Sequence, residues 1–431
     1  MHDIDLDINL MEISKIEGHA GLEVEIRQGK VKDVRFKIQE YKRFYTQGMS
    51  GKKAEILPQF VSRICGTCSN AHLLASTEAI ENALGIHITD QSKLLRRLMI
   101  NGLMIRDHAL HLYIFSLPDI FELDSLIDFD ETDPLQNQFL HDALEVKAIG
   151  NDLQVYIAGR SVHALFIAVG GFTQIPKTDP TSLIKKLESI RSAVIRLINL
   201  LIEKQVKLNH PTTYVALRGL NNWSFLDGNI ITSRKETIEE SKFREHFENV
   251  VIPYSQATGY TYQGQSYMVG ALSRLNINYD QLHSRTKNDL VNVLSLFPST
   301  DVFMNNVAQA IEMLHCIDDS IDILSNTHFV EEERVKSTQN EGIGIGVIEA
   351  PRGLLFYKVS ILEGSVVKGQ VVVPTGQNQI NIEKDIGKLV EDNLETMNQA
   401  EIEYEIEKLI RAYDPCISCA SHFLKVKWNI K

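Results

Sequence analysis

Four of the five cysteines in this chain form two C-x-x-C pairs, one near each end: Cys65 with Cys68, and Cys416 with Cys419. Two residues between thiols at the start of a helix let both sulfurs face one ion, and the positive helix end favours thiolates. Two such pairs would supply four sulfur ligands. Soft ligands of this kind suit zinc, an iron–sulfur cluster, or nickel together with iron.

The distance between the pairs bears on which of these sites they form. Cys68 and Cys416 are 348 positions apart, whereas the pairs of a structural zinc site are usually joined by roughly 15–20 residues. A site joining the two ends of a large chain is better suited to burying a cofactor, so we favour a redox metal site over structural zinc. The sequence supports a disulfide between these cysteines less than either kind of metal site. Cys316 stands alone and is expected to be a small buried hydrophobe.

The composition is that of an ordinary globular protein: 431 residues, 44% hydrophobic and 23% charged, with a formal net charge of −12. An acidic chain argues against binding to a phosphate backbone. No apolar run reaches the roughly 18–20 residues of a membrane span. The acidic N-terminus does not read as a signal peptide, and we therefore expect a cytoplasmic protein.

The hydrophobic pattern predicts a mostly helical body with two small antiparallel sheets, an α+β fold with the metal site buried at its centre. Hairpins are expected at 20–40 and 353–373, the second turning at Glu363-Gly364. Helices are expected at 69–84, with Ser69 as N-cap and Gly85 as stop, at 90–117, ended by Pro118, and at about 134–158, 180–208, 303–325 and 397–413.

No linker divides the chain, so we expect one domain over 1–431. It would comprise the hairpin at about 20–40, a helical core at about 52–350, the second hairpin at about 353–373, and a C-terminal helix and metal-binding segment at about 397–422. The stretch 210–300 is rich in turns. Gly342, Gly344 and Gly346 lack the spacing of a dinucleotide-binding loop and predict a flexible turn.

Several sequence blocks together resemble the large, catalytic subunit of the [NiFe] hydrogenases. They are R-x-C-G-x-C-x-x-x-H at 63–72, D-P-C-x-x-C-x-x-H at 414–422, I-E-G-H at 16–19, R-D-H-A-L-H-L-Y at 106–113, E-A-P-R-G at 349–353, and V-P-T with Q-N at 373–378. The blocks occur in the order of that family and extend over nearly the whole chain. In its compact length the chain most resembles the large subunits of the soluble, cytoplasmic branch, the sulfhydrogenase and NAD(P)-linked enzymes.

The resemblance implies a role for each matched residue. Cys65 and Cys416 would be terminal ligands of nickel, and Cys68 and Cys419 would bridge nickel and an iron that carries CO and cyanide. The remaining implied site residues are Arg352 over the metals, Asp107 and Asp414 holding it, Thr375 donating to a cyanide, His72 supporting a bridging cysteine, and Glu17 carrying protons. The implied reaction is the reversible cleavage of H₂ into protons and electrons.

The resemblance also implies partners, because one leftover cysteine cannot bind a cluster set. Electrons would pass to an iron–sulfur small subunit and then to diaphorase-type subunits, and maturation proteins would insert the metals. His422 would join a magnesium site, but Thr46 stands where the family often has its carboxylate. The family also often has histidine after E-A-P-R-G, where this chain has Tyr357-Lys358. Cleavage after His422, removing residues 423–431, is slightly favoured over an ordinary terminal strand.

Two alternatives to a hydrogenase stay open from the sequence. One is a non-catalytic relative such as the quinone-module subunit of respiratory complex I, which has lost the thiolates that this chain keeps. The other is a structural protein with a four-cysteine zinc site.

Overall fold

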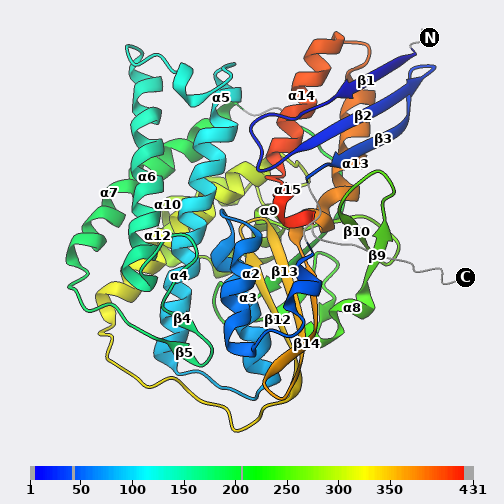
Figure 1. Cartoon of the computed structure of the whole chain (residues 1–431). Helices are drawn as coiled ribbons and strands as arrows, with labels where there is room; N and C mark the ends of the chain where they lie inside the picture. The colour runs from blue at the N-terminus through cyan, green and yellow to red at the C-terminus, as the bar shows by residue number, and fades with distance from the viewer. Residues whose placement is uncertain (1–4, 41–43, 205–206, 422–431) are drawn as a thin grey trace, which may run out of the picture.

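Eight helices of eight or more residues are present among the residues that the computed structural model describes, 5–40, 44–204 and 207–421 (Figure 1). They are α3 (Ser69–Ala83), α4 (Asp90–Ala109), α6 (Pro134–Ala158), α7 (Thr181–Lys204), α9 (Ala271–Asn278), α12 (Met304–Asn326), α13 (Pro374–Asn393) and α14 (Gln399–Ala412). The predicted helices at 69–84, 134–158, 303–325 and 397–413 are confirmed to within two residues. Asp133 caps α6 at its start, and Gly159, with φ 76°, ends it.

Shorter helical turns connect these elements. They are α1 (Tyr45–Met49), α2 (Leu57–Val61), α5 (Leu117–Ile120), α8 (Phe243–His246), α10 (Ser284–Asp289), α11 (Val291–Leu294) and α15 (Ile417–Ala420). The prediction that Pro118 ends the helix from residue 90 is wrong, because a π-helical segment, Leu110–Ser116, joins α4 to α5. The backbone N–H of Leu117 bonds the carbonyl of Leu112, five residues back, and this wider turn accommodates a proline that has no N–H.

Both predicted hairpins are confirmed, and each gains a third strand. The N-terminal sheet has the order β1 (Leu6–Leu10), β2 (Ala20–Arg27), β3 (Lys30–Ile38), and the C-terminal sheet has the order β12 (Gly342–Ala350), β13 (Gly353–Leu362), β14 (Ser365–Val372). All neighbours are antiparallel. Glu363 and Gly364 both have positive φ, 50° and 71°, as a two-residue type I′ turn requires.

The glycines at 342–346 lie in β12, so the predicted flexible turn is wrong. A Cβ on Gly344 would lie 2.1 Å from the carbonyl oxygen of Ala79, and one on Gly346 would lie 2.3 Å from that of Ala75. The missing side chains therefore let β12 pack directly against α3, the helix that follows the first cysteine pair.

The stretch 210–300 forms further sheets beyond the two predicted. A four-stranded sheet has the order β11 (Tyr267–Met268), β6 (Thr213–Arg218), β7 (Asn229–Thr232), β8 (Thr237–Ile238), with a parallel β11–β6 pair, and β9 (Phe247–Val251) pairs with β10 (Thr258–Tyr262). Earlier in the chain, outside this stretch, β4 (Ile167–Ala168) pairs with β5 (Gly171–Phe172). Their strands are too short to give a clear alternating pattern. A second apolar cluster packs mainly between this region and the C-terminal sheet.

Helix α13 was not predicted from the sequence: the buried side chains of its first turns are largely amides, and large apolar residues follow only from Ile382 onward. Asn378 bonds both the N–H and the carbonyl of Val269 next to β11, Gln377 donates to the carbonyl of Leu354 in β13, and Gln379 donates to that of Phe36 in β3. The helix therefore ties three sheets together through side-chain hydrogen bonds.

The main apolar core runs from Ile8 to Ala420 and includes all four paired cysteines. In Figure 1 the short red turn α15 lies near the middle of the molecule, with the N-terminal sheet and α14 above it and α3 and the C-terminal sheet below. None of the helices in the described ranges is long and apolar enough to cross a membrane.

Candidate metal centre

The four cysteines of the two C-x-x-C pairs converge on one buried point. The Sγ of Cys419 lies 3.0 Å from that of Cys68 and 3.0 Å from that of Cys416, and the Sγ atoms of Cys65 and Cys416 are 3.4 Å apart. All four sulfurs lie within 4.8 Å of one another, and none of the side chains is part of a disulfide. The predicted convergence of the two ends of the chain is present in the structure.

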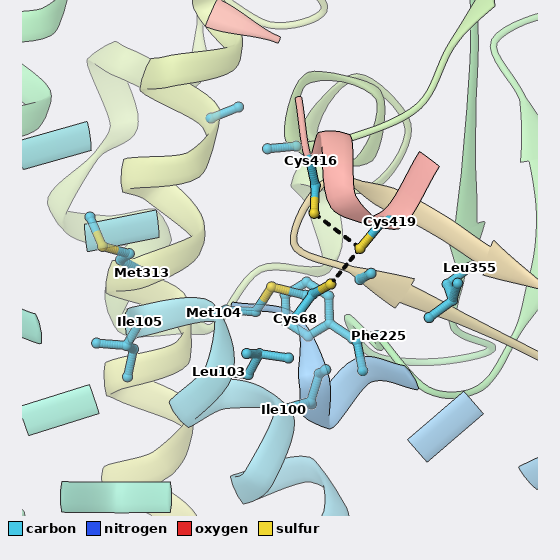
Figure 2. Close-up of a cluster of buried hydrophobic side chains, with 14 of the residues drawn as sticks. Cys68, Ile100, Leu103, Met104, Ile105, Phe225, Met313, Leu355, Cys416 and Cys419 are labelled. Atoms are coloured by element: carbon cyan, nitrogen blue, oxygen red, sulfur yellow. Dashed lines mark hydrogen bonds between the residues drawn. The ribbon is translucent and has the colours of Figure 1, made fainter. Parts of the chain in front are cut away.

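Figure 2 shows how two separate elements present these thiols. Cys416 and Cys419 extend from the C-terminal turn toward Cys68, above an apolar floor that includes Leu103 and Met104 of α4. Cys68, not the predicted Ser69, occupies the N-cap position of α3. The first pair therefore stands at the positive end of a 15-residue helix, where a thiolate is favoured.

The thiols differ in how readily they lose a proton. Hydrogen bonding from the thiol of Cys416 is the main cause that lowers the pKa of Cys65 well below its ordinary value. Burial raises the pKa of Cys416 and of Cys419. Four thiolates this close in an apolar site would repel one another, so their joint deprotonation requires a cation between them.

Arg352 is held beside the cluster by two carboxylates. Its Nη1 donates to Oδ2 of Asp107 at 2.6 Å, and its Nη2 donates to Oδ1 of Asp414 at 2.9 Å. All three residues are at least 96% buried. The Nε of Arg352 and the Oδ1 of Asp107 have no partner among the described atoms, and buried polar atoms of this kind are usually satisfied. The backbone φ of Asp414 is 50°, which turns the chain from α14 toward Cys416.

Two further networks fix this arginine, and the sequence did not reveal them. Gln309 of α12 donates to Oδ2 of Asp414 at 3.0 Å. The guanidinium of Arg274 bonds the carbonyls of Ala350 and Pro351, which precede Arg352. It also pairs with Glu312 and Glu349 in the fully buried core. A usable signal was present: Asn305, Gln309 and Glu312 recur every three to four residues along α12 and are all buried.

Glu17 contacts the terminal thiols predicted for nickel. Its Oε2 lies 3.2 Å from the Sγ of Cys416, and its Oε1 lies 4.0 Å from that of Cys65. The backbone N–H of Ser418 donates to Oε2, and the carbonyl of Glu17 accepts from the N–H of Ile417. Burial raises the pKa of this half-buried carboxyl. A carboxyl that can hold or release a proton beside a thiol has the geometry needed for proton transfer.

His72 and Thr375 also lie against the cluster. The Nε2 of His72 is 3.5 Å from the Sγ of Cys419, and burial lowers the pKa of this histidine to about 4, so its ring is neutral at pH 7. The Oγ1 of Thr375 accepts the backbone N–H of Cys416 at 2.9 Å. That bond uses the threonine as an acceptor, so its own O–H is free to donate to a ligand at the centre.

The magnesium prediction is not tested by this arrangement. His422 and the segment 423–431, with its predicted cleavage, lie outside the described residues. Thr46 belongs to α1, and its hydroxyl bonds the side chain of its neighbour Gln47. Among the described residues, the four cysteines form the only group of three or more metal-capable side chains.

Comparison with known proteins identifies the class of protein that this site defines. The family described as nickel-dependent hydrogenase matches residues 47–141 and 221–422. These ranges contain both cysteine pairs and most of the chain. The protein therefore belongs to the nickel-dependent hydrogenase family and is a large subunit of that family. This membership favours a hydrogenase over a structural zinc protein.

Similar individual proteins include two sulfhydrogenase subunits and one hydrogenase of known structure. The chain is 30% identical to the sulfhydrogenase 2 subunit alpha of Pyrococcus furiosus, over 97% of this chain and 100% of that protein. It is also 30% identical to the sulfhydrogenase 1 subunit alpha of the same organism, over 99% and 100%. The fold is similar to that of an NAD⁺-reducing [NiFe]-hydrogenase in the H₂-reduced state, with a TM-score of 0.88, 22% identity and coverage of 97% and 99%. The predicted fold class is confirmed.

The four-sulfur cluster fits the metal centre that this family implies. The donor set is soft and suits nickel and iron, and the deprotonated thiols require a cation. The unpartnered buried atoms of Arg352 and Asp107 are available to further groups at the site. Retention of all four thiols also argues against the non-catalytic alternative.

Proposed function

We propose that this chain catalyses the reversible heterolytic cleavage of H₂ at a nickel–iron centre held by its four clustered cysteines. The observation that carries the proposal is the convergence of two C-x-x-C pairs from opposite ends of the chain, together with the buried Arg352 that Asp107 and Asp414 hold. When bound, the centre would supply the soft metals that split H₂, with CO and cyanide on iron. Cys65 and Cys416 would be terminal on nickel, and Cys68 and Cys419 would bridge the metals.

The surrounding side chains have separate roles in this proposal. Glu17 takes the proton from the thiol of Cys416 and releases it toward the surface. Arg352, kept cationic by Asp107 and Asp414, orients groups above the sulfurs and is not the base, since arginine does not deprotonate readily. Thr375 donates its O–H to a cyanide, and His72 donates to the sulfur of Cys419.

The direct test is isotope exchange between H₂ and deuterated water by the purified complex. We expect exchange that depends on nickel supplied during growth, because proton transfer at the site does not require a downstream electron acceptor. A nickel-loaded complex without exchange would contradict the proposal.

Replacing Arg352 by lysine should lower H₂ oxidation on the order of 10–100-fold, the usual effect of changing a group that orients a metal site. An ammonium keeps the charge but cannot span the two carboxylates of Asp107 and Asp414 at once. The measurement is turnover with nickel content determined in parallel. Arg285→Lys, at a half-exposed pair with Glu188, is the matched control and should keep full activity. Equal activity in both variants would remove Arg352 from the mechanism.

We also propose an iron–sulfur small subunit as partner. Cys316 is the only cysteine left over in the sequence, so the chain has no ligand set for a cluster. The names of the relatives, subunit alpha, mark them as parts of assemblies. We further propose that diaphorase-type subunits accept the electrons, that maturation proteins insert the metals, and that the complex is located in the cytoplasm.

The partner proposal predicts that the isolated, nickel-loaded chain will lose most of its H₂-dependent reduction of a one-electron dye. Its isotope exchange should remain, because exchange needs only the site within this chain. Comparing both rates in the chain and in the whole complex tests this. Dye reduction at the full rate by the chain alone would show that no cluster-bearing partner is needed.

A further inference from the structure

Tyr357, which with Lys358 stands where the resembling family often has histidine after the E-A-P-R-G block, contacts the metal centre through His72. It lies in β13 with no exposed surface, and its phenol oxygen is 2.7 Å from Nδ1 of His72. The two rings meet edge to face, with their centroids 5.9 Å apart. On the other side of the imidazole, Nε2 faces the Sγ of Cys419 at 3.5 Å. Tyr357, His72 and Cys419 therefore form a continuous chain of polar contacts from β13 to the sulfur.

The direction of these hydrogen bonds follows from how few partners are available. Among the described residues, Nδ1 of His72 is the only hydrogen-bond partner of the Tyr357 hydroxyl. A buried O–H that donates to nothing is unfavourable, so the phenol must donate and Nδ1 must accept. A neutral imidazole that accepts at one nitrogen carries its proton on the other. Nε2 is therefore the donor toward Cys419.

We infer that Tyr357 is a positioning residue that locks His72 in the Nε2–H tautomer, so that the imidazole donates a hydrogen bond to the sulfur of Cys419. This inference rests on the proposed function, because Cys419 matters electronically only as a bridging ligand. Hydrogen bonds to metal-bound sulfurs withdraw electron density from the metal and tune its potential. Tyr357 acts on the centre through His72 without touching it.

Replacing Tyr357 by phenylalanine tests the inference in the assembled, metal-loaded complex. The ring and its packing stay, but His72 loses the donor that fixes its tautomer. The bond to sulfur weakens, more electron density stays on iron, and the CO stretching band moves to lower frequency. Nickel and iron contents should equal those of the wild type, and turnover should fall on the order of tenfold.

Tyr113→Phe is the matched control, because Tyr113 is also a fully buried phenol but donates to the carbonyl of Ala193. It should leave the CO band in place. A second comparison uses His72→Gln: if Tyr357 acts only through His72, adding Tyr357→Phe to that background should cause no further shift.

Incorporation of 3,5-difluorotyrosine at position 357 covers the case in which the phenylalanine variant fails to assemble. The fluorinated phenol is a stronger donor, so the CO band should move to higher frequency, opposite to the effect of phenylalanine. Bands that stay unmoved, or that move equally with and without His72, would overturn the inference while leaving the hydrogenase proposal intact. Absence of any CO band from the wild type would instead contradict the proposed centre itself.

Discussion

Replacing any one of Cys65, Cys68, Cys416 and Cys419 by serine will reduce H₂ uptake to background and prevent stable nickel incorporation. A serine hydroxyl is a hard, weakly acidic ligand, and one such substitution breaks a donor set whose sulfurs all lie within 4.8 Å of one another. The measurement is the nickel content per chain together with H₂-dependent dye reduction by the complex.

Cys316→Ala provides the control for this series. Cys316 is fully buried on α12 and lies outside the cluster, and burial raises the pKa of its thiol well above the ordinary value. Its removal should leave nickel content and turnover unchanged. A serine variant of the cluster that kept both nickel and activity would show that its sulfur is not a ligand.

Replacing Glu17 by glutamine should leave the metals in place and lower turnover by about 10²–10⁴-fold, the typical contribution of a general acid–base group. Glutamine keeps the acceptor for the N–H of Ser418 but cannot carry a proton from Cys416. Isotope exchange should fall with turnover, because the same proton step limits both. Nickel content and the infrared bands of CO and cyanide report whether the centre is assembled.

Glu23→Gln, at a partly exposed position on β2, controls for the loss of one negative charge and should behave as the wild type. If the Glu17→Gln variant showed normal isotope exchange and normal H₂ turnover, protons would have to leave the site by another route.

The sequence predicted the elements whose patterns are local. The helix at 134–158 has an N-cap, a proline at its start and a glycine at its end, and both hairpins have alternating strands with turn residues between them. The convergence of the cysteine pairs also followed from the sequence, because four soft ligands in one chain have few stable arrangements other than a shared metal.

Features that depend on tertiary contacts were missed. The first turns of helix α13 bury amides that bond three different sheets, so its apolar stripe is confined to its second half. The glycines of β12 are explained only by the approach of α3. The supports of the site, Gln309 and Arg274, are distant in sequence from the residues they hold and belong to no quoted block. Tyr357 was recognised as a departure from the family pattern. Its hydrogen bond to His72 could not be predicted, because it depends on the packing of β13 against α3.

The central claim is that the four cysteines hold nickel and iron in a hydrogenase centre. Metal analysis combined with infrared spectroscopy of the purified protein tests it most directly. The account predicts nickel and iron bound together, with sharp stretching bands from CO and cyanide on the iron. Zinc alone, without those bands, would contradict the account and return the cluster to a structural role.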